Sequence, residues 1–193
     1  MSNGGKSKAK GSAFERKICK DLSLWITDDE RDDLFWRSSN SGGRATIVNK
    51  EGGKHTQSGD ISAIHPLGHQ FIETFVIECK HYKNIQLEAF IFNGTGVFKE
   101  FWKQVRRDAR KSKKHPLLIA KQNNRPILLG LDREGASIFQ WGGSDELDKP
   151  PSKSITCWFP EYDLFIFDYE IFLLEHNSDV VGTWRPPKRK KKK

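Results

Sequence analysis

The stretch FIETFVIECKHY, Phe71–Tyr82, carries the strongest strand signal in the chain because it is rich in Phe, Ile, Val and Thr. Side chains alternate between the two faces of a strand, so Glu78 and Lys80 are expected to share one face and Cys79 the other. Roughly 6–7 Å of strand rise separates Glu78 from Lys80. Their charged ends can therefore reach a common point on that face of the strand.

A third charged residue belongs with this pair. Asp60 opens the preceding predicted strand, directly after Gly59, and it comes close to Glu78 if the two strands pair. Two neighbouring carboxylates are costly unless a cation lies between them, and Mg²⁺ typically takes one or two carboxylates together with substrate phosphate and water. Lys80 would add a positive charge beside an attacking water or a phosphate. The set suits metal-assisted phosphodiester hydrolysis.

The spacing of these residues is also that of a known motif. Gly59-Asp60, seventeen further residues and then Glu78-Cys79-Lys80 resembles the PD-(D/E)XK nuclease superfamily, with Gly59 in the place of the Pro. The segment GSAFERKICKDLSLW (residues 11–25) is similar to the N-terminal helix of archaeal-type Holliday junction resolvases. RSSNSGGR (residues 37–44) is similar to the Ser/Gly-rich segment after their first strand. The resemblance covers roughly residues 11–130.

The resemblance implies a DNA endonuclease that depends on Mg²⁺, with Mn²⁺ expected to substitute, and that leaves 5′-phosphate and 3′-hydroxyl ends. Glu15, Asp60 and Glu78 would hold the metal, and Lys80 would orient or activate water. Gln104 would face the site, as in related exonucleases. A resolvase cuts two strands symmetrically, so a homodimer is expected.

Alternatives stay open for the site and for the function. Glu15 also fits the last position of an S-x-x-E capping box that begins at Ser12, a role that needs no metal. The same core could serve a restriction- or repair-type enzyme that cuts linear duplex. A non-catalytic DNA-binding module with a decayed site is the third reading.

The order of predicted elements indicates an α/β domain, with a restriction-endonuclease-like core of mixed β-sheet flanked by helices. We expect helices over residues 12–26 and 99–113, and a long loop over residues 38–59, which is a candidate for strand or junction contact. Strands are expected over residues 34–37, 60–64, 71–82, 116–120, 126–131 and 136–141, and a strand running into a short helix over residues 163–174.

Basic residues are concentrated in three places within a chain of net charge +8. The segments 1–11 and 185–193 are expected to be disordered basic tails around a single domain, 12–184, which has its core over about 12–131 and an unassigned extension over about 132–184. The predicted helix over 99–113 lies in a block with eight basic residues against two acidic ones. Two explanations of this basic block stay open: it forms a solvent-exposed helix face, or it contacts DNA phosphates. The candidate DNA-binding residues are Lys103, Gln104, Arg106, Arg107 and Arg110.

The composition also bears on the compartment. The three cysteines lack the C-x-x-C spacing of a structural zinc site and are too scattered for a disulfide scaffold. No apolar run approaches the roughly 20 residues that span a bilayer, and the N-terminus has no apolar region typical of a secretory signal. We therefore expect a cytoplasmic, DNA-associated protein without a membrane segment.

Overall fold

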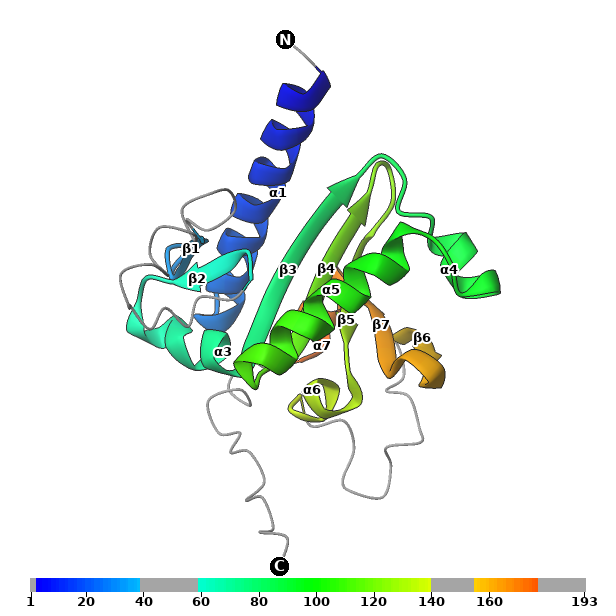
Figure 1. Ribbon diagram of the computed structural model, residues 1–193. Coiled ribbons are helices and arrows are strands. Elements are labelled where there is room, and N and C mark those ends of the chain that lie inside the picture. The colour runs from blue at the N-terminus through cyan, green and yellow to red at the C-terminus, as the bar shows by residue number, and fades with distance from the viewer. Residues whose placement is uncertain (1–2, 39–58, 140–154, 177–193) are drawn as a thin grey trace, which may run out of the picture.

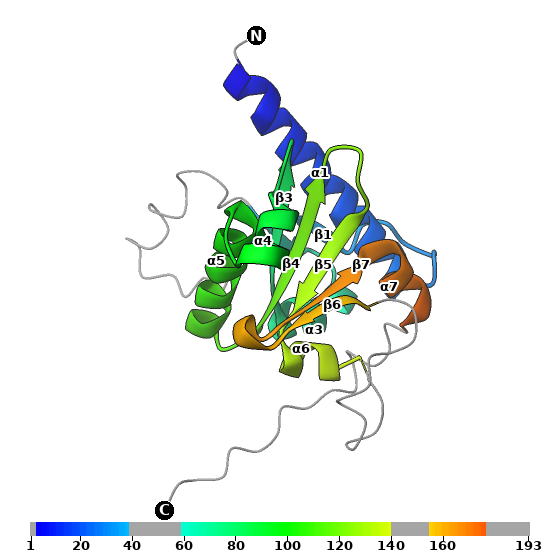
Figure 2. The same ribbon diagram turned by 90° about the vertical axis from the view of Figure 1, so that its right-hand side faces the viewer.

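The computed structural model describes residues 3–38, 59–139 and 155–176. They form three layers, with helices on both faces of a central sheet (Figures 1 and 2), which confirms the predicted α/β class. The elements in chain order are α1 (Asn3–Ile26), β1 (Phe35–Arg37), β2 (Ile61–Ala63), a 3₁₀ helix (Pro66–Gly68), α3 (His69–Thr74), β3 (Phe75–Tyr82), α4 (Leu87–Asn93), α5 (Val97–Ser112), β4 (His115–Gln122), β5 (Ile127–Leu131), α6 (Arg133–Ser137), β6 (Ile155–Phe159), a second 3₁₀ helix (Pro160–Tyr162), β7 (Leu164–Asp168) and α7 (Tyr169–Glu175).

The central sheet is mixed and has the strand order β3-β4-β5-β7-β6. Strands β3 and β4 run parallel, and the other neighbouring pairs are antiparallel. A parallel pair needs a long crossover connection, which α4 and α5 supply on one face of the sheet. Strand β3 therefore lies at an edge of this sheet, while β1 and β2 form a separate antiparallel pair beside it (Figure 1).

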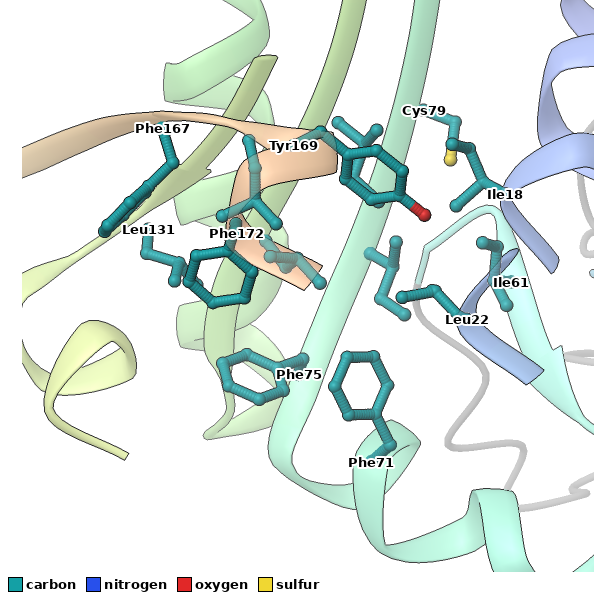
Figure 3. Close-up of a cluster of buried hydrophobic side chains, with 14 of the residues drawn as sticks. Ile18, Leu22, Ile61, Phe71, Phe75, Cys79, Leu131, Phe167, Tyr169 and Phe172 are labelled. Atoms are coloured by element: carbon teal, nitrogen blue, oxygen red, sulfur yellow. The ribbon is translucent and has the colours of Figure 1, made fainter. Parts of the chain in front are cut away.

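One face of the sheet packs against α1, α3 and α7 through a large aromatic and aliphatic core (Figure 3). Phe75 on β3 stacks on Phe139 with ring centroids 5.7 Å apart, and Phe71 on α3 packs against Phe75 at 5.2 Å. Ile18 and Leu22 of α1 are fully buried here, which fixes α1 against β3. Because α1 packs along the edge strand β3, Glu15 lies beside the edge of the sheet.

The opposite face is covered by α5, whose apolar residues follow the predicted helical spacing. Its buried apolar side chains are Phe98, Phe101, Trp102, Val105 and Ala109. The Trp102 indole N–H donates to the Tyr162 carbonyl oxygen at 3.0 Å, which satisfies its polar group inside the core. This packing orients the remaining face of α5, including Gln104, relative to β3.

The predicted start of the first helix is wrong. Helix α1 begins at Asn3, so it extends into the segment for which we expected a disordered tail. Ser12 and Glu15 lie inside the helix, where backbone amides donate to carbonyl oxygens of the preceding turn and need no capping side chain. The predicted capping-box role of Glu15 is therefore also wrong. The division of the chain into one domain and two tails stays a prediction.

Two strand predictions are wrong in part or whole. Residues 71–74 belong to α3, because the turn at Pro66 leads into a helix that inserts Phe71 into the core; the strand itself starts at Phe75. Residues 133–137 form α6, which Asp132 caps by accepting a hydrogen bond from the Gly135 amide at 2.7 Å. The end of that predicted strand, at residues 140–141, lies outside the described residues, as does most of the predicted loop over 38–59.

The segment after residue 131 extends the same sheet. Strand β7 pairs with β5, and β6 pairs with β7, so both add to the sheet that carries β3. The predicted strand and helix over 163–174 are confirmed as β7 and α7, whereas β6 and α4 were not predicted. Within the described residues, no helix combines the length and apolar character needed to cross a membrane.

Candidate active site

Glu78 and Lys80 lie on the face of β3 that α5 covers, as their alternation predicts. Glu78 is only 6% exposed, and its Oε1 accepts a hydrogen bond from the Gln104 amide nitrogen at 2.8 Å. The Lys80 ammonium forms an ion pair with the same oxygen and lies 5.7 Å from the centroid of the Phe101 ring. Gln104 therefore faces the site from α5, and the carboxylate of Glu78 is held from two sides.

Asp60 contacts β3 through its own hydrogen bonds and not through the expected pairing of two strands. Strand β2 pairs with β1 and not with β3, but Asp60 attaches directly to the free edge of β3. Its amide donates to the Ile77 carbonyl oxygen at 2.7 Å, and its Oδ2 accepts from the Cys79 amide at 2.9 Å. These two bonds bracket Glu78, so Asp60 is fixed next to it.

Gly59 makes this close approach possible. Its φ of +100° lies in a region that residues with side chains rarely adopt. A Cβ atom at this position would lie 2.6 Å from the Ile77 carbonyl oxygen. A glycine therefore precedes Asp60 because the backbone passes against β3 with a positive φ.

The electrostatics of Asp60 show that carboxylates converge here. Burial, followed by the charge of Glu78, raises the pKa of Asp60 from 3.8 to about 7, and Glu15 adds to this effect. The Cys79 amide and the charge of Lys80 act in the opposite direction. Without a cation, a protonated fraction of Asp60 therefore persists up to neutral pH.

This shift predicts how stability depends on pH in metal-free protein. The pKa of Asp60 is about 7 in the folded state and 3.8 in the unfolded state, so protonated Asp60 favours the folded state. Its contribution to the free energy of unfolding is complete below about pH 4 and is lost as the pH rises to 7. Asp60→Asn resembles the protonated side chain. We expect its free energy of unfolding, relative to wild type, to rise by about 4 kcal/mol between pH 4 and pH 8.

Urea unfolding of both proteins in EDTA at a series of pH values measures this difference. A difference that stays constant from pH 4 to pH 8 would show that the pKa of Asp60 is not raised in the folded state.

Glu15 approaches from α1 and is held by Arg37. The Arg37 guanidinium, at the end of β1, forms an ion pair with Glu15 Oε2 in a mostly buried setting. Arg37 was not predicted as a site residue, and the only signal was its place at the end of the first predicted strand. The structure thus brings Glu15, Asp60, Glu78, Lys80 and Gln104 to one region and adds Arg37.

Lys80 keeps its proton in this setting. Burial lowers the pKa of Lys80, but the charge and hydrogen bond of Glu78, together with Asp60, outweigh burial and raise it above 10.5. The side chain is therefore an ammonium group at neutral pH. Such a group can stabilise negative charge or orient a water, but it cannot accept a proton.

The donor set fits a divalent cation that takes few protein ligands. Among the described residues, no three acidic, histidine or cysteine side chains are grouped closely enough to hold a metal ion. Asp60 Oδ1 and Glu78 Oε2, however, accept no hydrogen bond from any described residue, whereas the second oxygen of each carboxylate does. Two carboxylates with substrate oxygens and water satisfy Mg²⁺, so the pair fits such an ion.

Three of the predicted basic DNA-binding residues of α5 already have polar partners within the protein. Arg106 donates to the Tyr162 carbonyl oxygen at 2.8 Å, and its guanidinium lies 5.9 Å from the centroid of the Trp102 ring, so it partly supports the fold. Lys103 pairs with Glu100 at 2.9 Å, and Arg107 lies 3.4 Å from Asp108. Part of the positive charge of α5 is therefore balanced within the helix and its neighbours.

The fold and the site together define a class. A mixed sheet whose edge strand carries Glu78-Cys79-Lys80, with Asp60 bound beside it and a helix on each face, is the arrangement of the PD-(D/E)XK nucleases. The family model described as "Phage putative PDDEXK endonuclease" matches residues 6–142, and the chain belongs to that family. No curated protein matches the chain. No solved structure matches it either.

Proposed function

We propose that this protein is a metal-dependent endonuclease that hydrolyses phosphodiester bonds in DNA. The observation that carries this proposal is the convergence of Asp60 and Glu78 at the edge of β3, with the Lys80 ammonium on Glu78. The family is one of endonucleases, which supports the reaction class. Mg²⁺ is the proposed cofactor, with Mn²⁺ able to replace it.

Asp60 and Glu78 would hold the ion through the oxygens that accept no hydrogen bond from described residues. A bound divalent ion would polarise the phosphate and lower the pKa of a water molecule. Gln104 keeps Glu78 in place through its 2.8 Å hydrogen bond. Glu15 is the proposed third ligand, but it is not grouped with Asp60 and Glu78 closely enough to bind the same ion, so its carboxylate would have to leave the ion pair with Arg37 and move toward them.

Lys80 acts as an electrostatic group in this proposal. Its ammonium lies beside the oxygen of Glu78, so it stands next to the position that the reacting phosphate and water would occupy. Because its raised pKa keeps it protonated, it orients the water and stabilises the charge that develops on the phosphate. The products would carry 5′-phosphate and 3′-hydroxyl ends.

The preferred substrate in this proposal is branched DNA, and the subclass is a Holliday junction resolvase acting as a homodimer. The support is the placement of Glu15 on a helix packed along β3, the feature that resembles the archaeal-type resolvases. The basic side chains of α5, Lys103, Arg107 and Arg110, would contact the DNA backbone, with Arg106 shared between DNA and the Tyr162 carbonyl.

Cleavage of a four-way junction and of a matched linear duplex, each with Mg²⁺ and with EDTA, tests the proposal. We expect the junction to be cut at least about tenfold faster than the duplex, a difference of about 1.4 kcal/mol. Equal cutting of both substrates would assign the protein to the duplex endonucleases. The absence of metal-dependent cutting on either substrate would leave a DNA-binding module without catalysis.

A further inference from the structure

A second basic cluster lies on the other side of the candidate site, on the α1 face of the sheet. We define the α1-side cluster as Lys10 on α1, His81 on β3, Lys121 on β4 and Asn123 in the turn after β4. His81 and Lys121 are direct neighbours in the parallel register of β3 and β4, so their side chains stand on the same face. All four residues are at least partly exposed.

The members of this cluster contact one another. The Lys10 ammonium donates to Asn123 Oδ1, and the Asn123 side chain lies near enough to His81 to act on the pKa of its imidazole. The Phe14 ring of α1 packs against the His81 ring at a centroid distance of 5.2 Å. These contacts hold Lys10 and His81 near a neutral amide, and Lys121 stands next to His81 on the neighbouring strand.

Positive charge in the cluster is not balanced by nearby carboxylates. Burial lowers the pKa of His81, and the charges of Lys10 and Lys121 lower it further. Among the described residues, neither lysine takes part in an ion pair with Asp or Glu. On α5, by contrast, Lys103 and Arg107 both have carboxylate partners. The α1-side cluster therefore carries positive charge that no carboxylate of the described residues neutralises through an ion pair.

The position of the cluster relates it to the catalytic strand. His81 directly follows Lys80 but projects from the opposite face of β3. Three residues of strand rise, about 10 Å, separate His81 from Glu78. Since β3 is the edge strand, a nucleic acid strand that crosses this edge can reach both faces.

We propose that the α1-side cluster is a phosphate-binding subsite, which holds a backbone phosphate of the DNA strand beside the one that is cut. Lys10 and Lys121 would bind the phosphate oxygens, and Asn123 would hold Lys10 and His81 in position. This inference rests on the proposed function, because it takes DNA as the substrate. It predicts that part of the DNA backbone lies over α1, in addition to any contact with α5.

DNA binding as a function of salt concentration tests this subsite. Fluorescence anisotropy would be measured in EDTA with the labelled four-way junction and duplex, for wild type, Lys10→Gln, Lys121→Gln and Lys121→Arg. Each Gln variant is expected to lower affinity about tenfold and to reduce the slope of log K against log salt by about 1. Lys121→Arg, which keeps the charge, should stay within about twofold of wild type.

Lys20→Gln is the matched control, because Lys20 also lies on α1 but pairs with Asp32 at 3.2 Å, away from the cluster. Its salt slope should equal that of wild type. Wild-type slopes in both Lys10→Gln and Lys121→Gln would overturn the subsite even if the enzyme cuts DNA. Reduced slopes in a protein that fails to cut DNA would support the subsite and reject the proposed function. A wild type that binds no DNA would overturn both.

Discussion

Replacing Asp60 by Asn is expected to abolish metal-dependent DNA cleavage, with a loss of at least about 1,000-fold in rate. The amide removes one of the two carboxylates that would hold the ion, and losing about 4 kcal/mol of transition-state stabilisation corresponds to that factor. The fold should persist, because an Asn oxygen can still accept the hydrogen bond from the Cys79 amide. Single-turnover cleavage with saturating protein measures the rate.

Asp33→Asn provides the matched control for this experiment. Asp33 is an exposed carboxylate that pairs with Arg31 at 2.8 Å, in the segment before β1. It should cut DNA at the wild-type rate. Cleavage by Asp60→Asn within tenfold of wild type, in a protein that still binds DNA, would remove Asp60 from the site.

Gly59→Pro, which restores the first letter of the superfamily motif, is expected to destabilise the protein by about 3 kcal/mol or more and to abolish cleavage. Proline fixes φ near −65°, whereas Gly59 has a φ of +100°. The backbone of Asp60 could then no longer donate to the Ile77 carbonyl oxygen without a rearrangement. Urea unfolding measures the change in the free energy of unfolding.

Two alanine variants separate the backbone effect from a general effect of losing glycine. Gly59→Ala should also destabilise, because its Cβ would lie 2.6 Å from the Ile77 carbonyl oxygen. A Cβ at Gly11, inside α1, meets no atom within 4 Å, so Gly11→Ala should leave stability unchanged or raise it by up to about 1 kcal/mol. A Gly59→Pro protein as stable as wild type would contradict the backbone conformation described for this turn.

Local patterns predicted the elements that carry the candidate site. The alternation in β3 placed Glu78 and Lys80 together, and the helical spacing of apolar residues in α5 predicted which face of that helix is buried. That Gln104 faces the site was implied by the resemblance to related exonucleases, not by this spacing. Both patterns depend on neighbours within one element, and burial of the apolar residues fixes each element in one orientation. The site residues within these elements could therefore be read from the sequence.

Contacts between distant segments could not be predicted in the same way. The pairing of Arg37 with Glu15 depends on how β1 meets α1, and the attachment of Asp60 to β3 depends on the free edge of the sheet. The start of α1 was missed because residues 3–11 lack an apolar pattern. In the first two cases, tertiary packing and not local propensity decides the outcome.

The central claim, that Asp60 and Glu78 share a divalent cation, is tested most directly by metal binding. Titration of Mn²⁺ into wild type, Asp60→Asn and Glu78→Gln can be followed by electron paramagnetic resonance, which measures the free ion. We expect wild type to bind Mn²⁺ and each variant to bind it at least about tenfold more weakly, as loss of a ligand predicts. Equal binding by all three proteins would contradict the claim.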